Sequence, residues 1–328
     1  MPRSSRDASR RAKAAALTSR SAEPHHMSGL PLRGARDLPH IDFDDLTRDA
    51  RTIHLDLGTG LGHFAVEMAV RDPEAYWIAV EHEGAVARRA ARRARNAGVA
   101  NVMVLCVDAR QLLYEWLPAQ CLDHIWINFP DPWPKDRHAD RRHTHPWMLQ
   151  LLASALHPGG GLHLATDVAE YAEAFAVALA ALPEWKTGHD LERAELGVTT
   201  KYERKWLAQG RHPHYADWTR TQDSAASPWP TSIERQDAPS LDPATLPLAT
   251  GVRRRGEHLL KLFPDRDGRQ HGVLIDRVLG YDQHCVIDIT TGRIDLGGVW
   301  TTWKCELFVD AQAERNQISA NSAPSVSR

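Results

Sequence analysis

The amino-acid sequence predicts an α/β protein with a mostly parallel, doubly wound sheet, followed by a small β-rich module. Two observations predict the sheet: short apolar runs alternate with helical patterns from Thr52 onward, and a glycine loop follows the first run. A third observation predicts the module. Residues 222–256 are rich in Pro, Ser, Ala and Asp, which is typical of a linker, and further short apolar runs follow them.

The first folded region is expected to span residues 41–221. Strands are predicted at its bounded apolar runs: Thr52–Leu57, Tyr76–Val80, Val102–Val107, Leu122–Phe129 and Gly161–Ala165. Helices are predicted where apolar residues recur at helical spacing: Phe64–Arg71, a segment that ends at Ala97 before Gly98, Trp147–Leu156 and Tyr171–Leu182. The run Pro158–Gly161 predicts a loop that leads into the fifth strand.

The flanking regions have different textures. Residues 1–40 are rich in Arg, Ala, Ser and Pro without a steady apolar period, which indicates a disordered basic arm. The β-rich module, residues 257–310, is expected to hold strands at Glu257–Phe263, Gly272–Leu279, Cys285–Ile289 and Lys304–Val309. Turn signals at Asp267-Gly268 and Thr291-Gly292 lie between them. Residues 311–328 are expected to form a disordered tail.

The composition is that of a globular protein with no metal centre or disulfide framework. Of 328 residues, 42% are hydrophobic and 25% charged, and no apolar run approaches the roughly 20 residues that span a bilayer. No apolar segment of a secretory signal follows the N-terminal arginines. The four cysteines are scattered, which favours a reducing cytosol, and the 18 histidines do not fall at metal-ligand spacings. With a net charge of −2, RNA binding would need local basic patches.

The first candidate site is the segment Asp56–Gly62, Asp-Leu-Gly-Thr-Gly-Leu-Gly, between a predicted strand and a predicted helix. Its glycines let backbone amides approach a ligand where side chains would clash: Gly58, Gly60 and Gly62. A dinucleotide-binding loop fits less well, because His63 stands where the third glycine is needed. The Asp56 carboxylate would repel a pyrophosphate but attract a methionine ammonium group. The loop therefore favours S-adenosylmethionine as cofactor.

Acidic residues also end the next two predicted strands. Glu81 ends the second strand, where a carboxylate can accept both hydroxyls of a ribose. Asp108, followed by Ala109, ends the third, where it can accept from an adenine amino group. One such acid alone is most simply an exposed polar cap. Three in succession after a glycine loop indicate a nucleoside site.

The second candidate site is Phe129–His138, at the end of the fourth predicted strand. Pro130 and Pro132 restrict the backbone on both sides of Asp131 and would hold its carboxylate in a stiff turn. Trp133 offers a face on which a base can stack. Basic residues follow and can contact phosphates: Lys135, Arg137, Arg141 and Arg142. An ordinary surface loop is the plainer interpretation, but the position beside the cofactor crevice favours methyl transfer to a nucleic-acid base.

Residues 53–221 resemble the tRNA (guanine-N7)-methyltransferase family. The matching stretches are Asp56–Gly62, Glu81, Asp108-Ala109, Pro130–Trp133, Lys135, Arg137-His138, Arg141-Arg142, Thr166-Asp167 and Thr200–Glu203. The resemblance implies a Rossmann-like class I methyltransferase fold and S-adenosylmethionine as cofactor. It also implies a cytoplasmic, RNA-binding enzyme that methylates N7 of a guanosine in the variable loop of tRNA.

The same resemblance implies roles for individual residues. Asp131 would be the catalytic residue. The cofactor would contact Asp56, Gly58, Gly60, Gly62, Glu81, Asp108, Ala109 and Asp131. The substrate would contact Lys135, Arg137, His138, Asp167, Thr200, Lys201, Tyr202 and Glu203.

Three residues depart from the family pattern: Asp56 replaces the usual Glu, Asp140 a Lys, and Trp206 a Gly. Two alternatives therefore stay open, a divergent paralogue that methylates another substrate and a non-catalytic protein that binds S-adenosylmethionine or RNA. The oligomeric state also stays open, with a monomer as the default. The β-rich module, which is outside the family's core, could contact RNA, recruit a partner or pack on the catalytic region. Its apolar strands and mixed charges favour packing.

A run of arginines lies on the predicted helix after the second strand: Arg88, Arg89, Arg92, Arg93 and Arg95. Residues four apart on a helix share a face, so Arg88 and Arg92 are expected to project together. The plain interpretation is a solvated face. The alternative is a ridge that follows the phosphates of tRNA.

Overall fold

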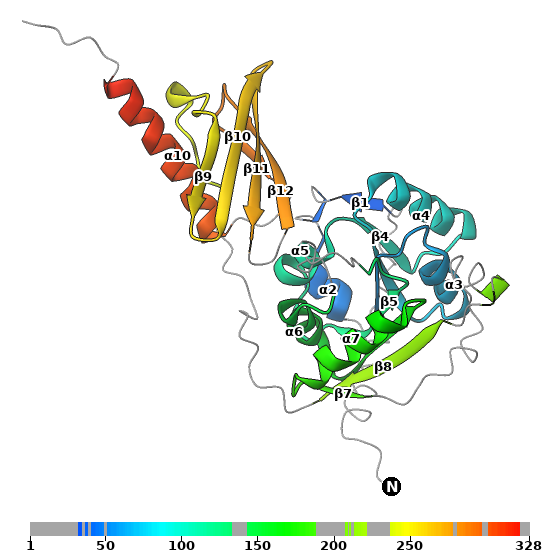
Figure 1. Ribbon diagram of the computed structural model, residues 1–328. Coiled ribbons are helices and arrows are strands. Elements are labelled where there is room, and N and C mark those ends of the chain that lie inside the picture. Colours follow the sequence, from blue (N-terminus) through cyan, green and yellow to red (C-terminus); the bar gives the residue numbers. More distant parts are fainter. Residues whose placement is uncertain are drawn as a thin grey trace, which may run out of the picture.

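The computed structural model describes residues 32–34, 37–38, 41–48, 51–132, 143–187, 207–208, 210, 213–221, 237–277, 281–296 and 301–321. These residues form two units, each built on its own sheet (Figure 1). The larger sheet has eight strands in the order β1-β4-β3-β2-β5-β6-β8-β7, and the smaller has five in the order β13-β12-β11-β10-β9. Within the described residues, no helix is both long and apolar enough to cross a bilayer.

The larger sheet is parallel except at β8. Its parallel strands are β1 (Leu32–Gly34), β2 (Ile53–Leu57), β3 (Tyr76–Val80), β4 (Val102–Cys106), β5 (Leu122–Asn128) and β6 (Leu156–Thr166). β8 (His214–Arg220) runs antiparallel between β6 and β7 (Trp185–Thr187). The chain adds β3 and β4 on one side of β2, and β5 and β6 on the other. In such sheets ligands bind outside the carboxyl ends of the strands, where the order reverses.

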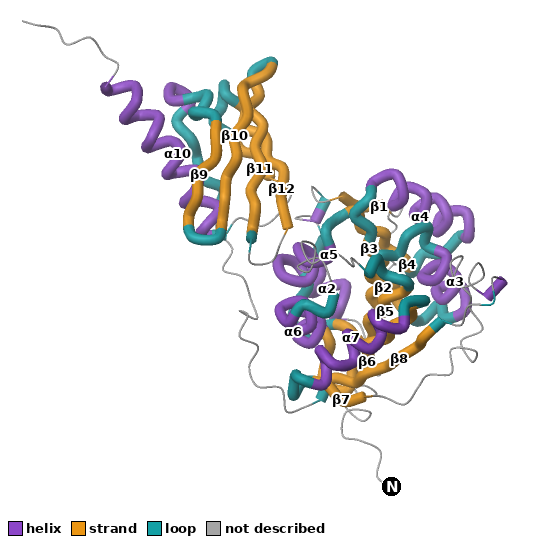
Figure 2. Tube along the Cα trace, viewed as in Figure 1, coloured by secondary structure: helices purple, strands orange, loops and turns teal. Residues whose placement is uncertain are grey.

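Helices cover both faces of this sheet, so the predicted doubly wound architecture is confirmed (Figure 2). α3 (His63–Arg71) and α4 (Gly84–Ala97) pack on one face, around Trp77 and Trp126. The other face carries α2 (Phe43–Arg48), α5 (Ala109–Gln111), the π-helix η2 (Leu112–Trp116), α6 (Pro146–Ala155) and α7 (Ala169–Ala180). All five residues of β2 are buried, as expected for a strand covered on both sides.

α4 lies close to the glycine loop because the residues that meet there, alanines on the helix and a glycine in the loop, have small or no side chains. Its buried face consists of alanines: Ala87, Ala90, Ala91 and Ala94. A Cβ added to Gly62 would come within 3.0 Å of the Ala90 Cβ, so the third loop glycine is needed for packing as well as for its φ of 71°. Gly98, at φ 67°, closes the helix as predicted.

The assigned bounds of β6 begin at Leu156 and include the predicted loop Pro158–Gly161. The pairing with β5 is nevertheless irregular there: it passes from Leu122–Leu156 to His124–Gly161, so regular pairing starts at Gly161, as predicted for the strand. Gly161 occupies a strand position where side chains from neighbouring strands converge. A Cβ there would lie 2.8 Å from the His124 Nδ1 and the His163 Nε2. Gly161 therefore marks a close approach, whereas Gly159, at φ 89°, lies in the irregular part of the strand. β1 also falls inside the segment predicted as a disordered arm; residues 1–31 lie outside the described residues.

The second unit is an antiparallel meander with a helix against one face. Its strands are β9 (Gly251–Arg255), β10 (His258–Arg266), β11 (Arg269–Asp276), β12 (Tyr281–Asp288) and β13 (Ile294–Leu296). A 3-10 turn, η4 (Pro243–Thr245), precedes them. α10 (Thr302–Asn321) covers the face that contains Leu260, Leu274 and Ile287.

Three predictions for this unit are wrong. Lys304–Val309 is helical and not a strand, and the helix continues to residue 321 in the predicted disordered tail. The buried positions of this helix follow helical spacing: Lys304, Leu307, Phe308 and Ala311. The predicted strand covered only six residues, and over so short a run a strand pattern and a helix pattern are hard to distinguish. β9 lies inside the predicted linker, where its three arginines conceal the strand. Residues 222–236 and 322–328 lie outside the described part of the chain.

Candidate functional site

The glycine loop begins at a buried carboxylate. Asp56, at 1% exposure, accepts hydrogen bonds from the Thr59 Oγ1 at 2.6 Å and the Asn128 Nδ2 at 3.1 Å. Gly58, Gly60 and Gly62 all have positive φ, at 77°, 57° and 71°. Among the described residues, no atom lies within 4 Å of a Cβ built on Gly58 or Gly60, so in this part of the structure that side of the loop has room for a ligand.

Glu81 holds the loop from the neighbouring strand. It is 9% exposed, and its two oxygens accept from the Gly60 N–H at 3.1 Å and the Glu83 N–H at 2.9 Å. Glu83 in turn caps the first turn of α4 by accepting from the Ala85 N–H. The His82 Nδ1 also lies 3.3 Å from one of these oxygens. A carboxylate offers about four lone-pair sites, so these contacts leave acceptor capacity for ribose hydroxyls.

Asp108 follows β4 and caps the first turn of α5. It accepts from the Arg110 N–H at 2.8 Å and forms an ion pair with the Arg110 guanidinium. Its side chain remains 27% exposed beside Ala109. The carboxylate is therefore fixed in orientation yet accessible.

The second candidate site, Phe129–His138, is called the target loop below, and it leaves β5 through a strained residue. Phe129 has φ 52° although it is bulky, and its N–H donates to the Ala165 carbonyl at 2.7 Å. This bond ties the start of the loop to β6, directly before Pro130 and the exposed Asp131. Such strain is concentrated at functional sites, where the surrounding structure maintains it.

Asp167 lies at the same edge of the sheet. β5 and β6 are parallel neighbours, with Asn128 opposite Ala165, so Asp167 and Asp131 both follow directly from carboxyl ends of adjacent strands. Thr166 Oγ1 accepts from the Val168 N–H at 3.2 Å and stabilises this turn into α7.

Four residues of the site were missed by the sequence reasoning: Thr59, Asn128, Arg110 and His143. The His143 Nδ1 lies 3.3 Å from the Tyr171 hydroxyl. Burial lowers the pKa of His143, the nearby Arg110 lowers it further, and Asp108 opposes both. His143 is therefore close to the Asp108–Arg110 pair, which means that the chain returns to this edge after the basic run. No spacing signal could have indicated it.

The structure thus brings five predicted acids to one edge of the sheet: Asp56, Glu81, Asp108, Asp131 and Asp167. The remaining predicted site residues lie outside the described residues: Trp133, Lys135, Arg137, His138, Arg141, Arg142, Thr200, Lys201, Tyr202 and Glu203. The same holds for Asp140 and Trp206. Among the described residues, no group of three or more His, Cys, Asp or Glu side chains could hold a metal ion.

Comparison with known proteins gives a consistent result. Residues 50–216 match the family model described as "Putative methyltransferase". A tRNA (guanine-N(7)-)-methyltransferase of Halorhodospira halophila is 47% identical over 133 residues, which are 40% of this chain and 58% of that relative's length. Enzymes of the same name from Syntrophotalea carbinolica and Caulobacter vibrioides are 32% and 36% identical, over 59% and 54% of this chain and 85% and 79% of theirs.

The family match ends at residue 216, before β9, so the β-rich unit lies beyond it. Within the matched region, the Syntrophotalea relative aligns over most of its own length. The chain belongs to the tRNA (guanine-N7)-methyltransferase family.

Proposed function

We propose that this protein transfers the methyl group of S-adenosylmethionine to N7 of a guanosine in tRNA, in the variable loop. The observation that carries the proposal is the hydrogen bond from Asn128 to Asp56. It joins the end of the strand that precedes the target loop to the strand that precedes the glycine loop. Donor and acceptor of the methyl group would therefore meet at one edge of the sheet.

The residues present fit this cofactor. Asp56, with the open side of the glycine loop beside it, would face the methionine ammonium group. Glu81 would accept from the ribose, and Asp108 with Ala109 would hold the adenine. When bound, S-adenosylmethionine supplies an electrophilic methyl group on a sulfonium.

The chemistry needs no general base. Guanine N7 carries a lone pair and no proton, so as the bond between carbon and N7 forms, the bond between carbon and sulfur breaks. The positive charge moves to the purine, S-adenosylhomocysteine leaves, and no proton is removed. A fixed carboxylate would stabilise both ends of this step similarly. Alignment should dominate, and it can contribute roughly 7–11 kcal/mol as effective molarity.

Asp131 is accordingly assigned to orient the guanine edge by accepting from its N–H groups, with Asp167 and Glu203 sharing that task. Lys135, Arg137 and His138 would contact the RNA, as would Thr200, Lys201 and Tyr202. A tRNA substrate would place the enzyme in the cytoplasm.

The test is to incubate the purified protein with labelled S-adenosylmethionine and unmodified tRNA, and then to map any methylated base. Label at N7 of guanosine supports the proposal. Label on another molecule would indicate a divergent paralogue, and bound cofactor without transfer would indicate a non-catalytic protein. Either of the last two outcomes would overturn the proposed function.

A further inference from the structure

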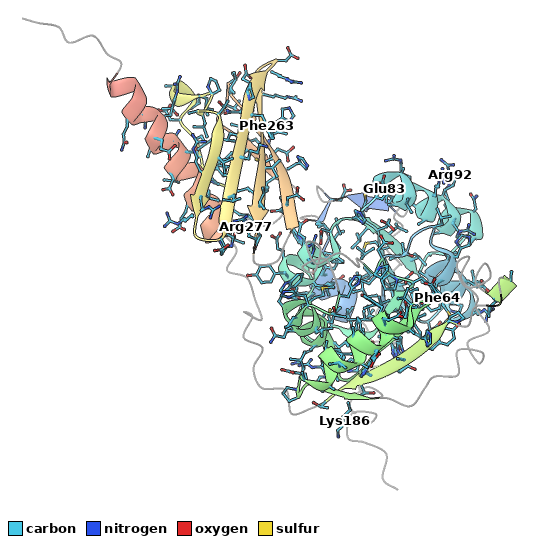
Figure 3. The ribbon with its side chains drawn as sticks, in the orientation of Figure 1. Phe64, Glu83, Arg92, Lys186, Phe263 and Arg277 are labelled. Atoms are coloured by element: carbon cyan, nitrogen blue, oxygen red, sulfur yellow. The ribbon has the colours of Figure 1, made fainter. Side chains whose placement is uncertain are left out.

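α4 has two faces of opposite character. Four of its alanines, Ala87, Ala90, Ala91 and Ala94, are fully buried, whereas all five of its arginines are exposed: Arg88, Arg89, Arg92, Arg93 and Arg95. Figure 3 shows Arg92 projecting from the outer side of the helix, away from the sheet. The chain as a whole has a net charge of −2, so this face is a local concentration of positive charge.

The arginines repel one another without internal compensation. Arg88 with Arg92 and Arg89 with Arg93 are four residues apart, a spacing at which like charges destabilise a helix. Among the described residues, no carboxylate forms a salt bridge with any of the five. The nearby Glu67 is paired with Arg71 at 2.8 Å. A face selected only for solvation would alternate charges of both signs, which would stabilise the helix.

A groove of about 590 Å³ runs between α3 and α4 beside this face. His63, Val66 and Glu67 line it from α3, and Glu67 is the residue already paired with Arg71. Arg89, Arg92, Arg93, Asn96 and Ala97 line it from α4. His63 directly follows Gly62, and the Arg93 Nε donates to the Leu61 carbonyl at 3.0 Å. The groove therefore begins at the glycine loop.

We propose that the exposed arginine face of α4, with this groove, binds the sugar–phosphate backbone of the RNA substrate. The inference rests on the proposed function, because it takes tRNA as the ligand. Guanidinium groups present planar forks that match phosphate oxygens in two-point contacts, and their charge is independent of physiological pH. Exposed arginines on a rigid helix can follow a duplex arm while a base from another part of the RNA reaches Asp131.

The experiment compares two triple variants with equal loss of charge. The test variant is Arg89→Gln, Arg92→Gln and Arg95→Gln, which leaves Arg93 on the glycine loop. The control is Arg254→Gln, Arg266→Gln and Arg269→Gln, three exposed arginines of the β-rich unit. Binding of an unmodified tRNA transcript is measured by fluorescence anisotropy over a range of salt concentrations, and S-adenosylmethionine binding by calorimetry.

The test variant should bind tRNA at least tenfold more weakly than wild type in low salt. Its plot of log affinity against log salt should be shallower by about 2 to 3, since each lost phosphate contact removes about 0.9 from the slope. Its cofactor affinity should be unchanged and its Tm unchanged or higher, because repulsion within α4 is relieved. The control should retain the wild-type slope.

A wild-type slope and affinity in the α4 variant would overturn the inference, as would an equal loss in the control. These readouts do not depend on turnover. If the wild-type protein transferred no methyl group to tRNA yet the α4 variant lost tRNA affinity, the proposed function would fail while the docking surface stood.

Discussion

Asp56 and Asn128 connect two strands that carry different parts of the site. The Asn128 amide donates to Asp56, whose other oxygen accepts from Thr59. The Asp56 carboxylate is thus held in one orientation by a hydrogen bond from the glycine loop and another from the end of β5. A carboxylate fixed in this way is oriented before the ligand arrives, which lowers the ordering cost of binding.

Replacing Asn128 with Ala should weaken S-adenosylmethionine binding about tenfold or more, because a hydrogen bond to a charged group contributes about 1.5–3 kcal/mol. Asn128→Asp should weaken it further, since a second carboxylate would stand about 3 Å from the first. Calorimetric titration measures both, with Asn96→Ala on the exposed side of α4 as control. Wild-type affinity in Asn128→Asp would contradict this role.

Asp131→Ala should abolish most methyl transfer while cofactor binding largely survives, because the proposed role of this carboxylate is to orient the guanine, and its contact with the cofactor is one of several expected there. Asp295→Ala, an exposed acid of the β-rich unit, serves as the matched control. The assay is single-turnover transfer to tRNA with saturating cofactor. Turnover within about tenfold of wild type, an effect of about 1.4 kcal/mol, would show that Asp131 is not needed for alignment.

The residues of this site differ in how far the sequence reveals them. Glu81 and Asp108 are recognisable because each ends an apolar run after a glycine loop. Asn128 is not, because its partner Asp56 is 72 residues away and only strand register brings them together. The His143 Nδ1 lies 3.3 Å from the hydroxyl of Tyr171, which is 28 residues away, and no local pattern encodes that contact. Contacts between distant segments are what the sequence alone could not supply.

At the scale of secondary-structure elements, neighbouring strands of the larger sheet share a buried row of polar rings. His54 on β2 stacks on Trp77 of β3, with ring centroids 4.3 Å apart, and accepts from the Trp126 indole N–H of β5. The His124 Nδ1 lies 3.0 Å from the His163 Nε2, and His163 is hydrogen-bonded to Asp217 on β8. The row links five strands through their side chains.

This row predicts that stability falls in mild acid. Burial, reinforced by neighbouring histidines, lowers the pKa of His54 to about 3 and that of His124 to about 4. Asp123 opposes the shift at both sites, and Asp217 opposes it at His124. Below pH 6.5 these two histidines become protonated in the unfolded chain but stay neutral in the folded protein. The unfolding free energy should therefore decrease from about pH 6.5 to about pH 4, by up to about 1.4 kcal/mol per pH unit for each histidine.

Urea unfolding at pH 7, 6 and 5 measures this slope. His124→Gln should lose part of it, because one of the two histidines of this row with a lowered pKa no longer titrates. His82→Gln should keep the wild-type slope, since the His82 side chain is 81% exposed. A free energy of unfolding that is flat between pH 7 and 5 would show that the histidine row does not couple to folding.

The elements themselves were partly predictable. Tyr76–Val80 is found as predicted, because a buried parallel strand is a continuous apolar run that polar residues bound. β8 was missed, because on a half-buried antiparallel strand apolar and polar residues mix. The start of α10 was wrongly predicted as a strand. Its buried stripe is narrow and includes Lys304, which is charged and so does not count as apolar when a sequence is searched for hydrophobic periodicity.

At the scale of the whole molecule, the two units meet through a buried ion pair. The Lys304 Nζ of α10 lies 2.5 Å from the Glu115 Oε1 of η2, and both side chains are 0% exposed. Gln111 and Gln283 donate to the other Glu115 oxygen at 3.2 and 3.4 Å. Because η2 continues α5, which Asp108 caps, the β-rich unit contacts the segment that leads from the expected adenine site. This packing agrees with the mixed charges of the module.

Breaking this pair on one side should be costly. Lys304→Met leaves the Glu115 carboxylate buried without its cation, and removal of one member of a buried pair typically destabilises a protein by about 3–5 kcal/mol. Burial lowers the pKa of Lys304 while Glu115 raises it, so the ammonium depends on this partner to remain charged. The double variant Glu115→Leu with Lys304→Met removes both charges and should recover most of the loss.

Chemical denaturation of the full chain gives the unfolding free energies of the single and the double variant. Arg255→Met is the control, because the ion pairs of Arg255 with Glu306 and Asp310 are exposed. Its unfolding free energy should change by less than about 1 kcal/mol. S-adenosylmethionine affinity, measured on the same proteins, shows whether the Lys304–Glu115 pair only stabilises the contact between the units or also affects the expected cofactor site. If docking fixes α5 through η2, then Lys304→Met should weaken S-adenosylmethionine binding and the double variant should restore it. Equal stability of the single variant and wild type would show that the two units do not meet at Glu115.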